Sequence, residues 1–390
     1  MNLESLRRKR VKRLGVKSTA HAGKRRIFFV LDRATRKFQG DIALWMQYIE
    51  FARKEKAYRK LSQILTSVLR MHPTKSELWV YAAQYALDTH ADMTEARSYM
   101  QRGLRFCKTS KILWLAYAKL EMIYIAKIAG RRRILGIDEN QTHQPRPAAA
   151  EDSDADVLTL PTVTAEDINP TLQPDDSVDQ AALRTLSSTP ALTGAIPLAI
   201  FDAAMKQFPT DDILGESFFS MFAEFNGVPC LTTVTQHVVD SLLTQSPTSA
   251  AAIICFIRQP AIGTTTTAVA FPGALAVCLK RLKYSASLSK PPWKLAEKVI
   301  DWLLPLTEPE VQDPGLHKVL TVTLGGAISD FKGEAILDTN MKADDFVRVV
   351  KTLQQAGYHG DAQKLIASGL ERWASNAQLR SIDAVTLDVQ

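Results

Sequence analysis

The chain has 390 residues, 46% of them apolar and 23% charged, a composition typical of a protein with one or two folded units. No apolar run approaches the roughly 20 residues of a membrane-spanning helix, so we expect no membrane contact. The four cysteines, Cys107, Cys230, Cys255 and Cys278, have no Cys-x-x-Cys spacing, which predicts neither disulfides nor a zinc site and favours a reducing compartment.

Charge is distributed unevenly along the chain. Residues 1–133 carry 30 Lys or Arg and 10 Asp or Glu, a net charge of +20, whereas residues 138–179 carry eleven acidic side chains and one Arg, a net charge of −10. This asymmetry predicts a basic module that faces a polyanion, followed by an acidic tether.

The N-terminal segment is the first candidate contact surface. It is rich in Arg and Lys with no apolar stretch behind it, so it does not resemble a secretory signal peptide. A solvated helix face, a nuclear localisation signal and a nucleic-acid contact all fit such a run. No RNA-recognition, KH or zinc-knuckle signature accompanies it, so we expect no sequence-specific readout. The candidate RNA or partner contacts are Arg7, Arg8, Lys9, Arg10, Lys12, Arg13, Lys24, Arg25 and Arg26, with a second cluster at Arg131, Arg132 and Arg133.

A repeat of 34 to 35 residues follows. Trp45, Trp79 and Trp114 recur at this spacing, and each begins a helical pattern of apolar residues. A second apolar helix precedes each Trp at the same period, so the repeating unit is a pair of helices. One pair cannot bury its apolar face alone, which predicts a stacked array. We interpret the Trp residues, with Tyr48 and Tyr117, as structural wedges between helices rather than ligand contacts.

Residues 131–190 interrupt the repeats. They contain Pro, Ser, Thr and acidic residues with few aromatics, which predicts a disordered acidic insert. A simple spacer, a docking element for a basic partner and a phosphorylation switch remain open as its role.

The repeat resumes in a degenerate form. Phe219 and Phe222 reproduce the spacing of Trp45 and Tyr48, and a segment around Gly369 matches one around Gly103. No stretch shows the period-two alternation of a half-buried strand. We therefore predict an all-α fold, an α-solenoid of helix pairs, in three parts: residues 1–130, the insert 131–190, and a degenerate array over 191–390.

The sequence contains no recognisable catalytic or ligand-binding motif. Phosphate-binding loops are absent, and the histidines have no metal-site or catalytic-triad spacing relative to Asp, Glu or Cys. We expect no enzyme activity, no cofactor, no metal and no small-molecule substrate.

The helix pairs resemble half-a-TPR (HAT) repeats more than tetratricopeptide repeats. The Leu-Gly pair expected after Trp in tetratricopeptide repeats is replaced, for example by Tyr48 and Ile49, and Glu50 and Glu121 supply an acidic residue typical of HAT helices. Residues 1–15, the helix that follows them and the Trp45 helix are similar to the U3 small nucleolar RNA-associated protein 6 family. The resemblance covers residues 1 to about 135, and more weakly 195–380. Helical sequence precedes the segment matching Met1 in that family, so we expect the chain to start inside the first repeat.

The resemblance implies a non-catalytic scaffold subunit of the small-subunit processome in the nucleolus. It implies a role in U3-dependent pre-rRNA processing and 18S rRNA maturation. The implied partners are β-propeller subunits of the same subcomplex, the U3 ribonucleoprotein and the pre-rRNA backbone. A HAT scaffold of the splicing or mRNA 3′-end machinery is the alternative. A chaperone adaptor that clamps an acidic peptide is a more distant one.

Overall fold

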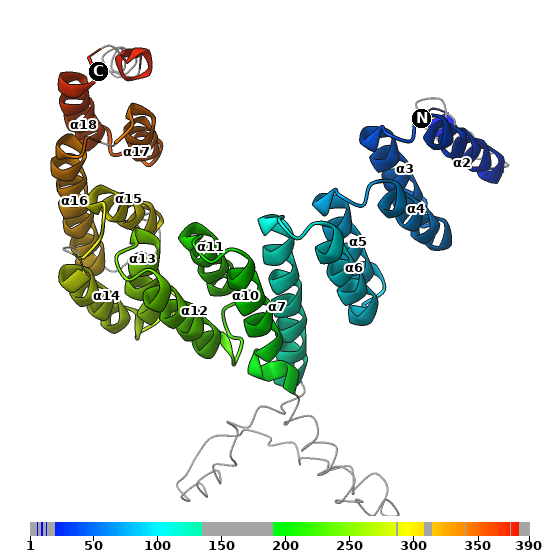
Figure 1. Ribbon diagram of the computed structural model, residues 1–390, viewed down its shortest axis with the longest axis horizontal. Coiled ribbons are helices and arrows are strands. Elements are labelled where there is room, and N and C mark those ends of the chain that lie inside the picture. Colours follow the sequence, from blue (N-terminus) through cyan, green and yellow to red (C-terminus); the bar gives the residue numbers. More distant parts are fainter. Residues whose placement is uncertain are drawn as a thin grey trace, which may run out of the picture. The chain divides into compact units, whose positions relative to one another are not determined.

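The computed structural model describes residues 20–134, 190–285, 288–307, 314–339, 341–374 and 376–381, together with Leu6, Lys9, Arg10 and Arg13. They form two compact units, residues 1–117 and 118–390, and the boundary falls inside helix α7 (Lys111–Ile134). The described residues are mainly helical and contain no strand, which confirms the predicted all-α fold (Figure 1).

Unit 1 consists of helices joined by short turns. Two kinds of helix alternate, and we name them A and B. The A helices carry the repeated Trp as their fourth residue and are α3 (Ile42–Lys54), α5 (Ser76–Thr89) and the start of α7. The B helices are α2 (Ala20–Lys37), α4 (Tyr58–Met71) and α6 (Met93–Phe106). Asp41 and Asp92 cap the starts of α3 and α6 by accepting backbone N–H bonds.

Unit 2 continues with the same alternation. The helices after α7 are α10 (Ala195–Gln207), α11 (Asp212–Ala223), α12 (Leu231–Gln245), α13 (Ala250–Arg258), α14 (Phe271–Ser285), α15 (Pro292–Leu303), α16 (Pro314–Leu337), α17 (Ala343–Gln355) and α18 (His359–Arg372). Three short 3₁₀ turns, at Pro190–Thr193, Gln259–Ala261 and Leu304–Thr307, lie between them.

Several helix ends share one backbone geometry, which identifies the repeat in both units. The residue after each of α4, α6, α10, α12 and α18 has φ between −142 and −115 and ψ between 51 and 71, and donates its N–H to the carbonyl four residues earlier. These residues are His72, Cys107, Phe208, Ser246 and Trp373. Their side chains have little in common, so the backbone preserves the repeat where the sequence does not.

The indole groups of the repeated Trp residues make equivalent hydrogen bonds. Trp45, Trp79 and Trp114 each donate the Nε1–H to the carbonyl six residues earlier, at 2.9, 2.9 and 3.1 Å. Trp45 and Trp79 are buried, and Trp114 is half-buried. Tyr48 and Tyr117 are also buried. The Trp side chain therefore fills a helix contact and secures the turn before its own helix.

Glycine provides the space for one of these side chains. A Cβ at Gly103 in α6 would lie 2.9 Å from Cγ of Trp79, closer than carbon atoms pack. The same relation recurs in unit 2, where a Cβ at Gly369 would lie 2.6 Å from Cε1 of Phe346. Phe346 is the fourth residue of α17, as Trp79 is of α5. Sequence matching identified the Gly369 segment but not Phe346.

The match at Phe219 differs from the structure by one helical turn. Helix α11 begins at Asp212, so Gly215 is its fourth residue and takes the position of Trp45. Phe219 and Phe222 are fully buried. They face the core one turn later because the space beside Gly215 is filled by Leu242 of α12, whose Cδ2 would lie 2.4 Å from a Cβ at Gly215.

The predicted acidic insert, residues 131–190, overlaps the described residues only at its two ends. Residues 131–134 form the last turn of α7, and residues 135–189 lie outside the described residues. The predicted division at residues 130 and 190 stays a prediction.

Candidate nucleic-acid interface

The N-terminal basic cluster is described only in part. Lys9, Arg10 and Arg13 are helical and exposed to solvent. Arg7, Arg8 and Lys12 lie outside the described residues. The positions that are described therefore present charge to solvent, as a contact with a polyanion requires.

Lys24 differs from its neighbours Arg25 and Arg26. Its Nζ lies 2.6 Å from a carboxylate oxygen of Glu55, and the Glu55 side chain is only 5% exposed. The Lys24 side chain is itself 32% exposed, so the pair is half-buried and joins α2 to the residue that follows α3. Arg25 and Arg26 are exposed on α2 and remain candidates for contact.

The second cluster lies in the other compact unit. Arg131 is exposed at the end of α7, Arg132 is half-buried, and Arg133 donates from its guanidinium to the carbonyl of Gly227 at 3.1 Å. Gly227 has a φ of +80, so its loop needs glycine. The structure does not bring the two predicted clusters together within one unit, and Arg133 has a structural contact.

A further set of cations in unit 1 was not identified from the sequence. Arg36, Arg70 and Arg105 occupy the last turns of the B helices α2, α4 and α6, 34 and 35 residues apart, and all three are exposed. An exposed lysine lies within five residues after each of these arginines in the sequence. We call these six residues the cation edge: Arg36, Lys37, Arg70, Lys75, Arg105 and Lys108. Applying the Trp period to the basic residues would have found the three arginines.

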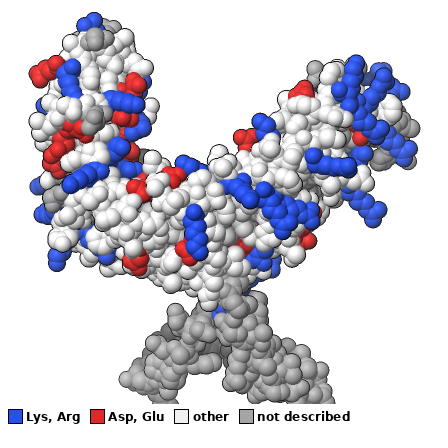
Figure 2. All heavy atoms as spheres, in the orientation of Figure 1, with Lys and Arg blue, Asp and Glu red and all other residues white. Residues whose placement is uncertain are grey.

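The geometry of the helix pair places these cations on one side of unit 1. Short turns join the end of each B helix to the start of the next A helix, so these ends share one edge of the array. Cations near a helix C-terminus interact favourably with the helix dipole, so these arginines also stabilise their own helices modestly. Figure 2 shows Lys and Arg gathered over the N-terminal helices.

Most carboxylates of unit 1 are already engaged in local interactions. Asp41 and Asp92 cap helices, Glu55 pairs with Lys24, and Glu95 accepts from the hydroxyl of Tyr99 at 2.9 Å. Asp32 pairs with Arg36 at 2.7 Å, but that arginine side chain stays 78% exposed, and such surface pairs contribute little. Arg70 and Arg105 make no ion pair with any described residue. The cation edge therefore keeps charge available for a ligand.

A small polar hollow adjoins the first member of the cation edge. Its volume is about 250 Å³, and it lies between α2, α3 and α4 with Arg36, Lys60, Gln63 and Ser67 in its wall. The hydroxyl of Tyr48, which also lines it, is buried without a hydrogen-bond partner among the described residues, and burial raises the pKa of Tyr48 to about 12. Asp32 also lines the hollow and lies 2.7 Å from Arg36 and 3.8 Å from Lys60, so the two cations there are partly neutralised.

The remaining chemistry of the described residues is structural. All four cysteines are buried and free, and burial raises the pKa of each thiol, which keeps it protonated at neutral pH. The described residues contain no group of three or more metal-ligating side chains. None of the described helices combines the length and apolar character needed to cross a bilayer.

Comparison with known proteins gives partial matches. No family model matches the chain. U3 small nucleolar RNA-associated protein 6 of Schizosaccharomyces pombe is 36% identical over 176 residues, which is 43% of this chain and 36% of that protein. Its Homo sapiens and Mus musculus homologs are 29% and 31% identical over 103 residues, 26% of this chain and 17% of each relative. These homologues confirm the resemblance noted in the sequence, and the matches span well under two thirds of the relatives' lengths.

Proposed function

We propose that this chain is a non-catalytic scaffold subunit of the small-subunit processome, acting in the nucleolus in U3-dependent pre-rRNA processing and 18S rRNA maturation. Its relatives are named for association with U3 small nucleolar RNA, which supports a place in the U3 ribonucleoprotein. The observation that carries the proposal is the cation edge, a repeated row of exposed charge on a stacked helical array.

The cation edge is suited to the phosphate backbone rather than to bases. Each helix pair contributes one arginine and one lysine to the cation edge, and packed helices lie about 8 to 10 Å apart, so a nucleic-acid strand along the edge would meet cations at regular intervals. Lys and Arg that neutralise phosphates release the condensed counterions, and this contribution does not depend on sequence. The described aromatic anchors Trp45 and Trp79 are buried and cannot stack on bases. RNA binding is therefore expected to be weak, salt-sensitive and indifferent to sequence.

The helical surfaces of both units leave room for protein partners. We propose β-propeller subunits of the same subcomplex as these partners, held by the array while the cation edge contacts RNA. Repeat arrays expose long surfaces of this kind because each repeat contacts only its neighbours.

The experiment is affinity purification of the tagged chain from nuclear extract, with RNA and protein both identified. Recovery of U3 RNA, pre-rRNA and β-propeller subunits is the expected result. Splicing or polyadenylation factors in their place would contradict the proposal and place the chain in another RNA-processing machine. A cation-edge variant, R36Q/R70Q/R105Q, should retain the protein partners and lose part of the RNA that the parent retains after a salt wash.

A further inference from the structure

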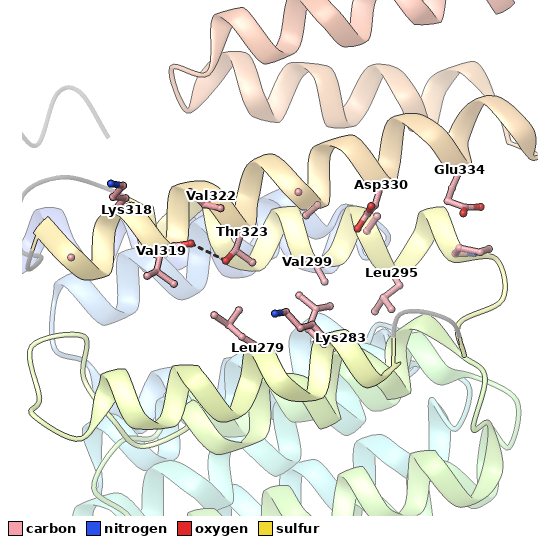
Figure 3. Close-up of a pocket in the computed structure, with 16 residues that line it drawn as sticks. Leu279, Lys283, Leu295, Val299, Lys318, Val319, Val322, Thr323, Asp330 and Glu334 are labelled. Atoms are coloured by element: carbon pink, nitrogen blue, oxygen red, sulfur yellow. Dashed lines mark hydrogen bonds between the residues drawn. The ribbon is translucent and has the colours of Figure 1, made fainter.

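A large hollow lies within unit 2. It has a volume of about 910 Å³ and runs between α14 and α16, with α15 beneath it (Figure 3). Leu295 and Val299 of α15 form a buried floor, and Leu279 of α14 forms part of one wall. The hollow is a groove rather than a closed cavity, because Val319 and Val322 in its other wall are 47% and 69% exposed.

Two hydrogen bonds involve the helices that form the groove. Trp293 of α15 donates its indole N–H to a carboxylate oxygen of Asp338, just beyond α16, at 2.7 Å. Thr323 in the wall uses its hydroxyl within α16, donating to the carbonyl of Val319 at 2.8 Å. The first hydrogen bond ties α15 to the end of α16, and the Thr323 hydroxyl is already satisfied within its own helix.

Charges mark the two ends of the α16 wall differently. Lys318 lies near the start of α16, whereas Asp330 and Glu334 lie toward its end (Figure 3). The helical rise separates Lys318 from Asp330 by about 18 Å. None of these three residues forms an ion pair with a described residue. The floor is thus apolar and the α16 wall is cationic at one end and anionic at the other, while Lys283 of α14 places a further exposed cation on the opposite wall, between Leu279 and Leu295 (Figure 3).

We propose that this groove binds an amphipathic helix of a partner protein that runs antiparallel to α16. The apolar side of the helix would lie on Leu279, Leu295 and Val299, in the helix-in-groove mode. Basic side chains in its first turn would face Asp330 and Glu334, and acidic side chains in its last turn would face Lys318. The positive N-terminal end of its dipole would lie by the two carboxylates, which favours the same direction. A helix of about four turns spans the marked length.

Gly326 gives the most direct way to close the groove. It lines the groove on α16, and a Cβ there would meet nothing within 4 Å. Leucine at this position would occupy the space of the ligand, and it is a better helix former than glycine. Gly333 is a matched control on the same helix, because a Cβ there also meets nothing within 4 Å and it does not line the groove.

The probe is a synthetic amphipathic peptide of about 16 residues. Leucines repeat at spacings of three and four on one face, lysines occupy the first turn and glutamates the last. A second peptide exchanges the lysines and glutamates. Both carry a covalent staple on the polar face, so that both are helical before binding. Binding to the full chain and its variants is followed by fluorescence anisotropy.

The expected result is preferential binding of the first peptide to the parent. The Gly326→Leu variant should bind it at least about tenfold more weakly, equivalent to 1.4 kcal/mol, and Gly333→Leu should bind like the parent. The double variant D330K/E334K should weaken the first peptide and favour the second. Equal binding of both peptides, or binding unchanged by Gly326→Leu, would overturn the proposal. A parent chain that sediments as a dimer, and as a monomer in Gly326→Leu, would show that a second copy occupies the groove instead.

Discussion

The two units are built from the same helix pairs but fill the helix contact differently. In unit 1 the fourth residue of every A helix is Trp, and Trp79 lies against Gly103. In unit 2 the equivalent positions in α11 and α17 are Gly215, which lies against Leu242, and Phe346, which lies against Gly369. In each of these three contacts a large side chain packs against a glycine, and the large side chain comes from the first helix of the pair in two cases and from the second helix in the other. The contact conserves volume rather than residue type.

The units differ in charge as strongly as in packing. Residues 1–117 contain 25 Lys or Arg and 9 Asp or Glu, whereas residues 118–390 contain 23 and 32, of which one Arg and eleven acidic residues belong to the segment 138–179. In unit 2 several cations pair with carboxylates of other helices, as Lys298 does with Glu216 and Arg348 with Glu297. In unit 1 the cation edge stays exposed. Similar helical frameworks therefore carry an electrostatic surface in one unit and an apolar groove in the other.

The largest expected effect comes from removing a Trp wedge. Trp79→Ala should destabilise unit 1 by about 3 to 5 kcal/mol, because it deletes a buried aromatic that the surrounding helices cannot replace. The loss should stay local, since repeats contact mainly their neighbours. Hydrogen exchange with mass spectrometry should show faster exchange in α5 and α6 and little change in α17 and α18. The matched variant Phe346→Ala should give the reverse pattern. Unchanged melting and exchange in both would refute the wedge assignment.

The reversed contact in α11 and α12 should show coupling between its partners. Gly215→Ala should cost about 1 to 3 kcal/mol, because the new Cβ overlaps Leu242. Adding Leu242→Ala should remove that overlap, so the two changes together cost less than the sum of the single changes. Chemical denaturation of the four proteins in a double-mutant cycle measures the coupling, expected at about 1 kcal/mol or more. Strict additivity would show that the two residues do not fill one shared space.

A smaller effect concerns pH and a buried carboxylate of unit 2. Burial raises the pKa of Glu297, although its partner Arg348 acts in the opposite direction. The folded state therefore binds this proton more readily than the unfolded state, so the stabilising contribution is present at low pH and is lost as pH rises through the folded-state value. The free energy of unfolding of the parent, minus that of Glu297→Gln, should increase as pH falls from neutral to about 5, because the folded parent gains stability on binding the proton. Urea denaturation at both pH values measures it, and a constant difference would contradict the expectation.

The sequence predicted the fold where one residue type repeated at a fixed position. Trp45, Trp79 and Trp114 defined the helix pairs because indole both fills the contact and hydrogen-bonds the preceding turn. In α11 the same volume comes from Leu242 on the neighbouring helix, so a search along one helix placed the register one turn late at Phe219. A volume shared between two helices leaves no pattern in either helix alone.

The candidate interface was predictable only in part, for a related reason. The count of basic residues indicated a polyanion surface, but it did not separate Lys24, which pairs with buried Glu55, from Arg25 and Arg26, which are exposed. Nor did local clustering reveal the cation edge, whose arginines are about one repeat apart in the sequence and lie on one edge of unit 1. The groove gave no signal either, because its lining comes from three helices whose apolar residues resemble ordinary core.

The account is tested most directly by RNA binding measured against salt with variants at opposite edges of unit 1. R36Q/R70Q/R105Q removes three charges from the cation edge, whereas R53Q/K54Q/R59Q removes three exposed charges from the opposite ends of the helices. With a random-sequence single-stranded RNA, the first variant should lose affinity. Its plot of log K against log salt should become shallower, with a slope about 2 less negative, because three phosphate contacts are lost. The second should stay close to the parent. Equal losses in both variants would show that only net charge matters, and no loss in the first would contradict the claim that the cation edge binds RNA.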